Sequence, residues 1–129
     1  MLPFTVSIRP GLSVHEQVVF AVKKAIVSGR LRPGDEFPSV RAISRDLRIN
    51  PNTAHKVVAT LTTEGLLDVR PGIGTFVAER PASSAEQRRA LLREDVERLV
   101  VDARHLSLDV QDVLDAVAEQ WNRLDRGGR

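Results

Sequence analysis

Two helix-start signals stand close together near the middle of the chain and limit how it can fold. Ser39 follows Pro38, and eleven residues after Ser39 an asparagine, Asn50, precedes Pro51. Serine and asparagine are favoured N-caps because their side-chain oxygens accept a hydrogen bond from a free backbone N–H. Proline suits the first helical position because it lacks that N–H. A short helix must therefore be followed, after a tight turn, by a second helix.

Apolar residues at a helical period extend this pair into a unit of three helices. A helix before the pair is expected from a capping box of Ser13 and Glu16 to an end at Gly29. The last of the three is expected to run from about Pro51 to Glu64. The residues on the inner faces are Val14, Val18, Ala21, Val22, Ala25 and Ile26 in the first helix, Ile43 and Leu47 in the second, and Ala54, Val57, Val58 and Leu61 in the third.

After the third helix the apolar pattern changes to the alternation that is typical of strands. Leu67-Asp68-Val69-Arg70 and Thr75-Phe76-Val77-Ala78 are expected strands, and Pro71-Gly72-Ile73-Gly74 between them is a hairpin turn. Glu36-Phe37 could add a very short strand. Three helices followed by a hairpin predict a winged helix-turn-helix, a fold that is mainly α with a small β-hairpin wing.

The chain on either side of this unit has a different character. Residues 1–12 are punctuated by proline and glycine and are expected to form an extended or irregular arm. Pro81-Ala82-Ser83-Ser84 is a small polar linker, which places two domains at residues 1–80 and 81–129. The first domain holds 11 Lys/Arg against 7 Asp/Glu, and the second holds 8 against 10. A basic first domain is compatible with nucleic-acid binding, and equally with a basic surface that binds nothing.

The second domain is expected to contain two amphipathic helices, because its apolar residues are spaced 4, 3, 4, 3 twice. We place Ser107 as the N-cap of the second of these helices and Asp109 in its first turn. The two apolar stripes are Leu92, Val96, Leu99, Ala103 and Leu106, and Val110, Leu114, Val117, Trp121 and Leu124. Two such helices have too little core to stand alone, so their stripes must be buried against each other, against the winged helix or against a second copy of the chain.

Several classes of protein are excluded by residues that the chain lacks. It has no cysteine, which excludes disulfides, Cys-ligated zinc and thiol catalysis. No apolar stretch approaches the roughly 18 residues that span a bilayer, and no signal peptide is recognisable, so we expect a cytoplasmic protein. The three histidines show no metal-ligand spacing, and no nucleophile–base set or phosphate loop is present. We therefore expect no enzyme activity, no catalytic residue, no metal and no cofactor.

The start of the third helix holds the candidate base-reading residues. A helix in the major groove reads bases with the exposed face of its first turns. Asparagine can pair with adenine, threonine can touch phosphate or the thymine methyl group, and histidine can donate to guanine. An ordinary polar surface with a cap would contain the same residue types. The outward positions are Asn50, Asn52, Thr53, His55 and Lys56.

Four motifs, in order and spacing, resemble the DNA-binding domain of the GntR family over roughly residues 13–79. They are Phe37-Pro38-Ser39-Val40-Arg41, Asn50-Pro51-Asn52-Thr53, Glu64-Gly65-Leu66-Leu67 and Gly72-Ile73-Gly74-Thr75-Phe76-Val77. The Asn-Pro-Asn-Thr phrase and the short tail further resemble the YtrA subfamily. The resemblance implies a sequence-specific DNA-binding transcription regulator, usually a repressor, that dimerises through a helical tail on a palindromic operator in double-stranded DNA.

The resemblance also implies which residues contact DNA. Arg41 would reach DNA from the second helix, the start of the third helix would contact bases and phosphates, and the glycine-rich wing tip would enter or flank the minor groove. The complete candidate set is Arg41, Asn50, Pro51, Asn52, Thr53, His55, Lys56, Arg70, Gly72, Gly74 and Thr75.

Three residues depart from the family pattern. Pro51 and His55 stand where many relatives have arginine, so the preferred operator should differ. Arg48 occupies a turn position where the family often has glycine. If that position is left-handed, arginine costs on the order of 1 kcal/mol there. Arg48 is then either retained for a phosphate contact or an ordinary solvated side chain.

The tail is expected to form a homodimer, since two recognition helices read a palindrome with far greater discrimination than one. The expected dimerisation residues are Leu99, Leu106, Leu114, Val117 and Trp121. In the alternative, Trp121 seals a core within the chain. No residue marks a site for a small-molecule effector. A rival function is a winged helix for protein contacts or non-specific nucleic-acid binding.

Overall fold

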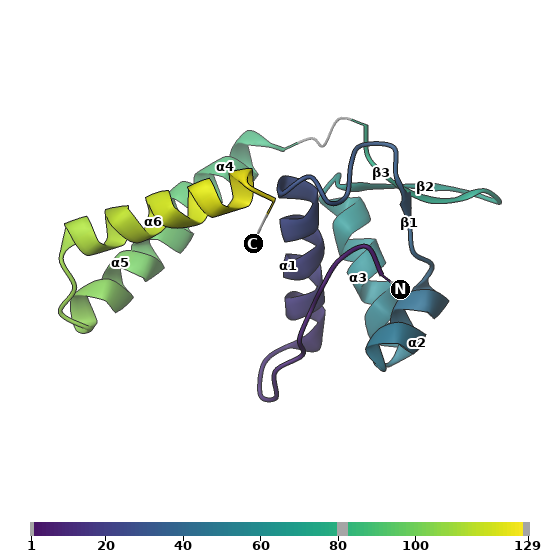
Figure 1. Cartoon of the computed structure of the whole chain (residues 1–129), viewed down its shortest axis with the longest axis horizontal. Helices are drawn as coiled ribbons and strands as arrows, with labels where there is room; N and C mark the ends of the chain where they lie inside the picture. The colour runs from purple at the N-terminus through teal and green to yellow at the C-terminus, as the bar shows by residue number, and fades with distance from the viewer. Residues whose placement is uncertain (1, 80–82, 128–129) are drawn as a thin grey trace. The chain divides into compact units, whose positions relative to one another are not determined.

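A computed structural model describes residues 2–79 and 83–127, which form two compact units (Figure 1). The predicted domain boundary at residue 80 and the first half of the predicted linker lie outside the described residues. Ser83 and Ser84 of that linker are described, and Ser84 begins a helix. Across the two described ranges, no helix is long and apolar enough to cross a membrane.

Three helices of the first unit begin where the sequence signals predict. They are α1 (Val14–Val27), α2 (Val40–Leu47) and α3 (Pro51–Thr63). The Ser13 and Ser39 hydroxyls accept hydrogen bonds from backbone N–H groups three residues later, at 3.2 and 3.1 Å. The Asn50 side-chain oxygen accepts from the backbone N–H of Asn52 at 2.8 Å, and Pro51 is the first residue of α3. These caps confirm the closely spaced helix starts.

The predicted inner faces meet in one core. α3 packs against both α1 and α2, and Val18, Val22, Ile43, Val57 and Leu61 are completely buried. At the ends of the helices burial is partial, because Val14, Ile26 and Leu47 pack only against the margin of this core. The helix-turn-helix is therefore supported by buried side chains from all three helices.

The wing is a three-stranded antiparallel sheet in the order β1 (Glu36–Phe37), β3 (Gly74–Val77), β2 (Leu67–Arg70). The short strand and both hairpin strands are confirmed, with two corrections to the bounds of the last strand. Ala78 was predicted in that strand but lies beyond its end at Val77, because the Ala78 N–H donates to the Leu66 carbonyl at 3.0 Å. Gly74 was predicted in the turn but pairs with Arg70 in the ladder. The reason is that Ile73 N–H donates to the Arg70 carbonyl at 3.0 Å, which closes a tighter turn. The β2–β3 hairpin projects away from the helices (Figure 1).

The N-terminal arm, which was predicted to be extended or irregular, is packed onto this unit. Phe4 is 5% exposed, and its ring stacks on Phe37 of β1 with centroids 6.0 Å apart and planes 6° apart. The Gln17 side chain of α1 accepts from the Arg9 N–H at 2.8 Å and donates to the Arg9 carbonyl at 3.1 Å. The arm is therefore fixed at two places by non-local contacts.

The second unit contains α4 (Ala85–Ala90), a π-helical turn (Leu91–Asp95), α5 (Val96–His105) and α6 (Val110–Asp125). The prediction of Ser107 as the N-cap of α6 is wrong. Ser107 is left-handed, with φ 61°, and closes α5 while Leu108 N–H donates to the Ala103 carbonyl at 2.9 Å. Asp109 has the extended backbone of a cap and forms a capping box with Asp112.

Candidate nucleic-acid interface

The outer face of α3 is a continuous polar strip. Asn52, His55 and Lys56 are exposed and lie three and four residues apart, so they share one face of the helix. Thr53 is half-buried beside this strip. On the opposite side Ala54 and Val57 are completely buried and hold the helix to the core. The structure thus brings these predicted residues together at one end of α3.

Asn50 and Asn52 differ in which side-chain hydrogen-bonding groups are unengaged. The Asn50 side-chain oxygen is occupied by the cap hydrogen bond to the Asn52 N–H, which leaves its amide N–H groups. The Asn52 side chain makes no hydrogen bond to any residue in the ranges 2–79 and 83–127. Asparagine reads adenine with an acceptor and a donor together. Both groups of Asn52 are unengaged, whereas the Asn50 oxygen already caps the helix.

The cations of α2 are not equally available. Arg41, the second residue of the helix, is exposed and forms no ion pair with the described part of the chain. Arg45 donates from Nε to Asp46 Oδ1 at 3.1 Å, and this hydrogen bond lowers the pKa of the Asp46 carboxyl. Arg41 is therefore the residue of this pair that is free to meet an anion.

The turn between α2 and α3 begins with a left-handed arginine. Arg48 has φ 54° and ψ 48°, so its backbone is left-handed and carries the strain of on the order of 1 kcal/mol expected for arginine there. Its N–H and that of Ile49 both donate to the Ser44 carbonyl. The Ser44 hydroxyl donates in turn to the Ile49 carbonyl at 2.7 Å. These bonds fix the backbone of the turn independently of the arginine side chain.

The wing presents a supported arginine beside bare backbone. The Arg70 guanidinium lies 4.4 Å from the centre of the Phe76 ring, a cation–π contact that the sequence analysis missed. The strand register could have indicated this contact, because it places Arg70 and Phe76 diagonally across β2 and β3 on one face of the sheet. Gly72 has φ 77°, and a side chain there would meet no atom within 4 Å. Thr75 is half-buried in the ladder and Ile73 is 71% exposed at the tip.

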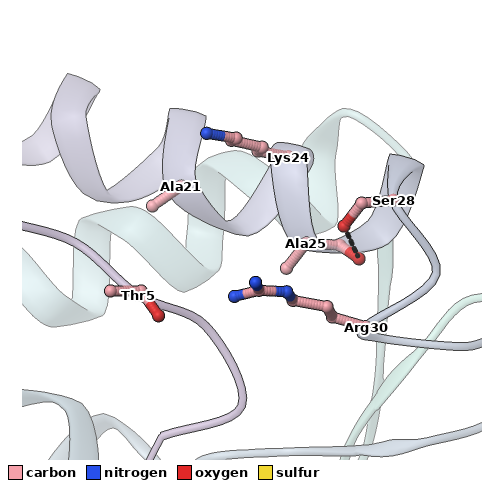
Figure 2. Close-up of a pocket in the computed structure, with 6 residues that line it drawn as sticks. All are labelled: Thr5, Ala21, Lys24, Ala25, Ser28 and Arg30. Atoms are coloured by element: carbon pink, nitrogen blue, oxygen red, sulfur yellow. Dashed lines mark hydrogen bonds between the residues drawn. The ribbon is translucent and has the colours of Figure 1, made fainter. Parts of the chain in front are cut away.

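A hollow of about 300 Å³ lies elsewhere in the first unit, between α1 and the N-terminal arm. Figure 2 shows the Arg30 guanidinium between Thr5 and Ala25, with the Ser28 hydroxyl donating to the Ala25 carbonyl at 3.4 Å. None of the predicted DNA-binding residues lines it. Within the described ranges, no group of three or more His, Asp or Glu residues could hold a metal ion.

The tail carries an uncovered apolar groove of about 450 Å³ between α5 and α6. It is lined by four of the five predicted dimerisation residues, and Leu114 lies outside the lining. Trp121 is 70% exposed, so it does not seal a core between the helices of the second unit. In residues 83–127, Ala103 is the single buried hydrophobic side chain. The four lining residues are Leu99, Leu106, Val117 and Trp121.

Comparison with known proteins identifies the chain's family. Residues 14–77 match the family described as bacterial regulatory proteins, gntR family. The chain is 27% identical over 112 residues to the HTH-type transcriptional repressor YtrA of Bacillus subtilis, covering 86% of each chain. It is 30% identical over 104 residues to the HTH-type transcriptional regulator YhcF of the same organism, covering 81% of this chain and 86% of that one.

A solved structure extends the likeness through the tail. It is described as a transcriptional antiterminator from Listeria monocytogenes, with a TM-score of 0.83 and 25% identity, over 94% of this chain and 91% of that one. The fold prediction of a winged helix-turn-helix followed by tail helices is confirmed by this likeness. The relatives are transcription regulators and not enzymes. The chain belongs to the GntR family and is a DNA-binding transcription regulator.

Proposed function

We propose that the chain is a dimeric repressor of the YtrA type that binds a palindromic operator in the cytoplasm. The observation that carries this proposal is the exposed strip at the start of α3, where Asn52, His55 and Lys56 face outward. A helix with its side chains is about 10–12 Å across and fits a major groove about 12 Å wide. The start of α3 can therefore enter the groove without a change in the fold.

The proposed contacts with DNA are of two kinds, those that read bases and those that bind phosphate and position the protein. Asn52, with a free acceptor and donors, would pair with adenine, and His55 would donate to guanine. Lys56 at the edge of the strip would bind phosphate, as would Arg41 at the start of α2. Thr53, beside the strip, would contact phosphate or a thymine methyl group.

The remaining candidates act at the two edges of this surface. The Asn50 amide would donate to phosphate while its oxygen keeps the cap, and Pro51 would contribute only apolar contact because it lacks an N–H. In the wing, Arg70 is held over Phe76 and would reach into or beside the minor groove. Gly72 and Gly74 would allow the backbone to approach the sugar-phosphate, with Thr75 as a polar neighbour.

The tail supports a homodimer as the occupant of its apolar groove. Contiguous exposed apolar surface on a small protein marks interaction sites. Two copies packed by α5 and α6 would cover Leu99, Leu106, Val117 and Trp121, with Leu114 at the margin. Such a dimer presents two copies of α3, which suits an operator with two related half-sites. The similarity to a repressor favours repression as the outcome.

A titration by fluorescence anisotropy would test this proposal. The probes are a duplex from the promoter that precedes the protein's own gene and a scrambled duplex of the same composition. We expect the promoter duplex to bind at least about 10³-fold more tightly at physiological salt. Equal affinity for the two duplexes would contradict the proposal and favour the rival, a non-specific or protein-binding winged helix.

A pair of variants on α3 tests the assignment of the reading end. Asn52→Ala should weaken binding to the promoter duplex by about 1–3 kcal/mol. Thr63→Ala is the matched control, because Thr63 is exposed at the other end of the same helix. Equal effects of the two variants would contradict the reading role of Asn52.

A further inference from the structure

The helices of the first unit all end at a left-handed residue, but the residue type differs. Gly29 follows α1 with φ 84°, and Gly65 follows α3 with φ 80°. Glycine suits these positions because it has no Cβ to meet the following carbonyl. At the end of α2 the left-handed residue is Arg48, with φ 54°, directly after the last helical residue. Arginine is therefore the exception among the left-handed residues that close the three helices of this unit.

The rest of the fold does not require a side chain at this position. Arg48 is exposed, and within the described ranges its side chain forms no ion pair or hydrogen bond. The turn is fixed by the Ser44 carbonyl and hydroxyl, which bond to the backbone of residues 48 and 49. Glycine would keep those bonds and remove the strain of a left-handed arginine.

The position of Arg48 beside the reading helix indicates what the side chain is for. It stands two residues before Asn50, so at most about 7 Å of backbone separates it from the start of α3. Because a docked helix fills the major groove, residues that flank its N-terminus lie at the groove wall, which is lined by phosphates. A long, unpaired cation at that place can reach them.

We infer that Arg48 is a further DNA-contacting residue, which binds a backbone phosphate from the helix-turn-helix turn and adds affinity without reading bases. This inference rests on the proposed function, because it requires the start of α3 to lie in the groove. It predicts that the fold becomes more stable, and DNA binding weaker, when Arg48 is replaced by glycine.

Four variants separate this role from simpler ones. Arg48→Gly removes both the charge and the strain, whereas Arg48→Lys keeps both. Arg30→Gln removes one positive charge from the hollow in Figure 2, which no residue of α2, α3 or the wing lines. Ser107→Gly relieves the other left-handed non-glycine residue, with φ 61°, in the tail. Each is measured for its melting temperature and for promoter-duplex affinity across a series of salt concentrations.

The expected results have opposite signs for stability and binding. Arg48→Gly should melt a few degrees higher than the wild type. Its log–log salt slope should be smaller by about 0.9 per contact, and its affinity at 0.15 M salt lower by about fivefold per contact, or about 30-fold for a dimer. Arg48→Lys, Arg30→Gln and Ser107→Gly should keep the wild-type slope.

Three outcomes would overturn the inference. In the first, Arg48→Gly keeps the wild-type salt slope. In the second, Arg48→Lys loses as much DNA affinity and salt slope as Arg48→Gly. In the third, Arg30→Gln lowers the salt slope as much as Arg48→Gly does, which would indicate an effect of net charge alone. Failure of the proposed function looks different, because the wild type would then not distinguish promoter from scrambled DNA. The slope of Arg48→Gly on scrambled DNA would still decide whether Arg48 touches phosphate.

Discussion

Asn50 has two roles that substitution can separate. Its side-chain oxygen caps α3 through a 2.8 Å hydrogen bond, and the same side chain stands where we place the DNA backbone. Asn50→Ala removes the cap and should destabilise the first unit by about 1 kcal/mol. For a unit of this size that corresponds to a fall in melting temperature of about 4–8 °C. Calorimetry or thermal melts followed by circular dichroism would measure it.

Asn50→Asp keeps the cap but adds a negative charge. A carboxylate oxygen accepts the same hydrogen bond, and its charge interacts favourably with the start of a helix by about 0.3–1 kcal/mol. The stability of this variant should therefore equal or exceed that of the wild type. Its affinity for the promoter duplex should nevertheless fall by at least about tenfold, because the new charge faces phosphate.

The control for added charge is Thr63→Asp, which places a carboxylate at the exposed far end of α3. It should leave operator affinity within about twofold of the wild type if that end lies outside the groove. Two results would refute the reasoning: an Asn50→Ala protein as stable as the wild type, or an Asn50→Asp protein that binds operator as tightly. The first result would show that the cap does not stabilise α3. The second would show that the start of α3 does not lie against DNA.

Three further substitutions test other parts of the molecule. Phe4→Ala should destabilise the first unit by about 3–5 kcal/mol in urea unfolding, because Phe4 is buried against Phe37; an unchanged midpoint would mean that the arm is not packed. Trp121→Ala should weaken self-association by at least about 30-fold in sedimentation, and a wild type that is monomeric at tens of micromolar would exclude the tail dimer. Arg70→Gln should cost less than about 1 kcal/mol of stability but reduce the salt slope of DNA binding by about 0.9 per contact; an unchanged slope would exclude a phosphate contact.

The fold was predictable from sequence where local signals decide the structure. The start of α3 at Pro51 follows from a cap residue and a proline that act within one turn. The start of α6 was misjudged because Ser107 and Asp109 are both good caps, and sequence alone does not say which one adopts the extended backbone. The left-handed closure of α5 at Ser107 decides it. The stacking of Phe4 on Phe37 joins residues far apart in the chain, so no local pattern indicates it.

In the candidate site, too, local spacing was predictable from sequence, whereas contacts between separate elements were not. The spacing of Asn52, His55 and Lys56 places them on one helix face whatever the tertiary structure. The support of Arg70 by Phe76 depends on the strand register, which a one-residue change in the turn would have altered. The left-handed backbone of Arg48 depends on how α2 ends, which no local pattern predicts. Only the resemblance to the GntR family, which often has glycine there, suggested that this position could be left-handed.

The polar contacts of α3 with the rest of the unit are concentrated at one end of the helix. Toward its C-terminus, His15 Nε2 and Thr60 Oγ1 lie 2.8 Å apart, and Lys23 Nζ donates to Glu64 Oε1 at 3.0 Å, so α1 holds this end. Within the described ranges, residues 50–56 make no hydrogen bond to another helix or strand, and they are held by buried Ala54 and by their own cap. Polar groups engaged inside the protein cannot also bind bases. The attachment of α3 by its far end therefore leaves the polar groups of its first turns available to DNA.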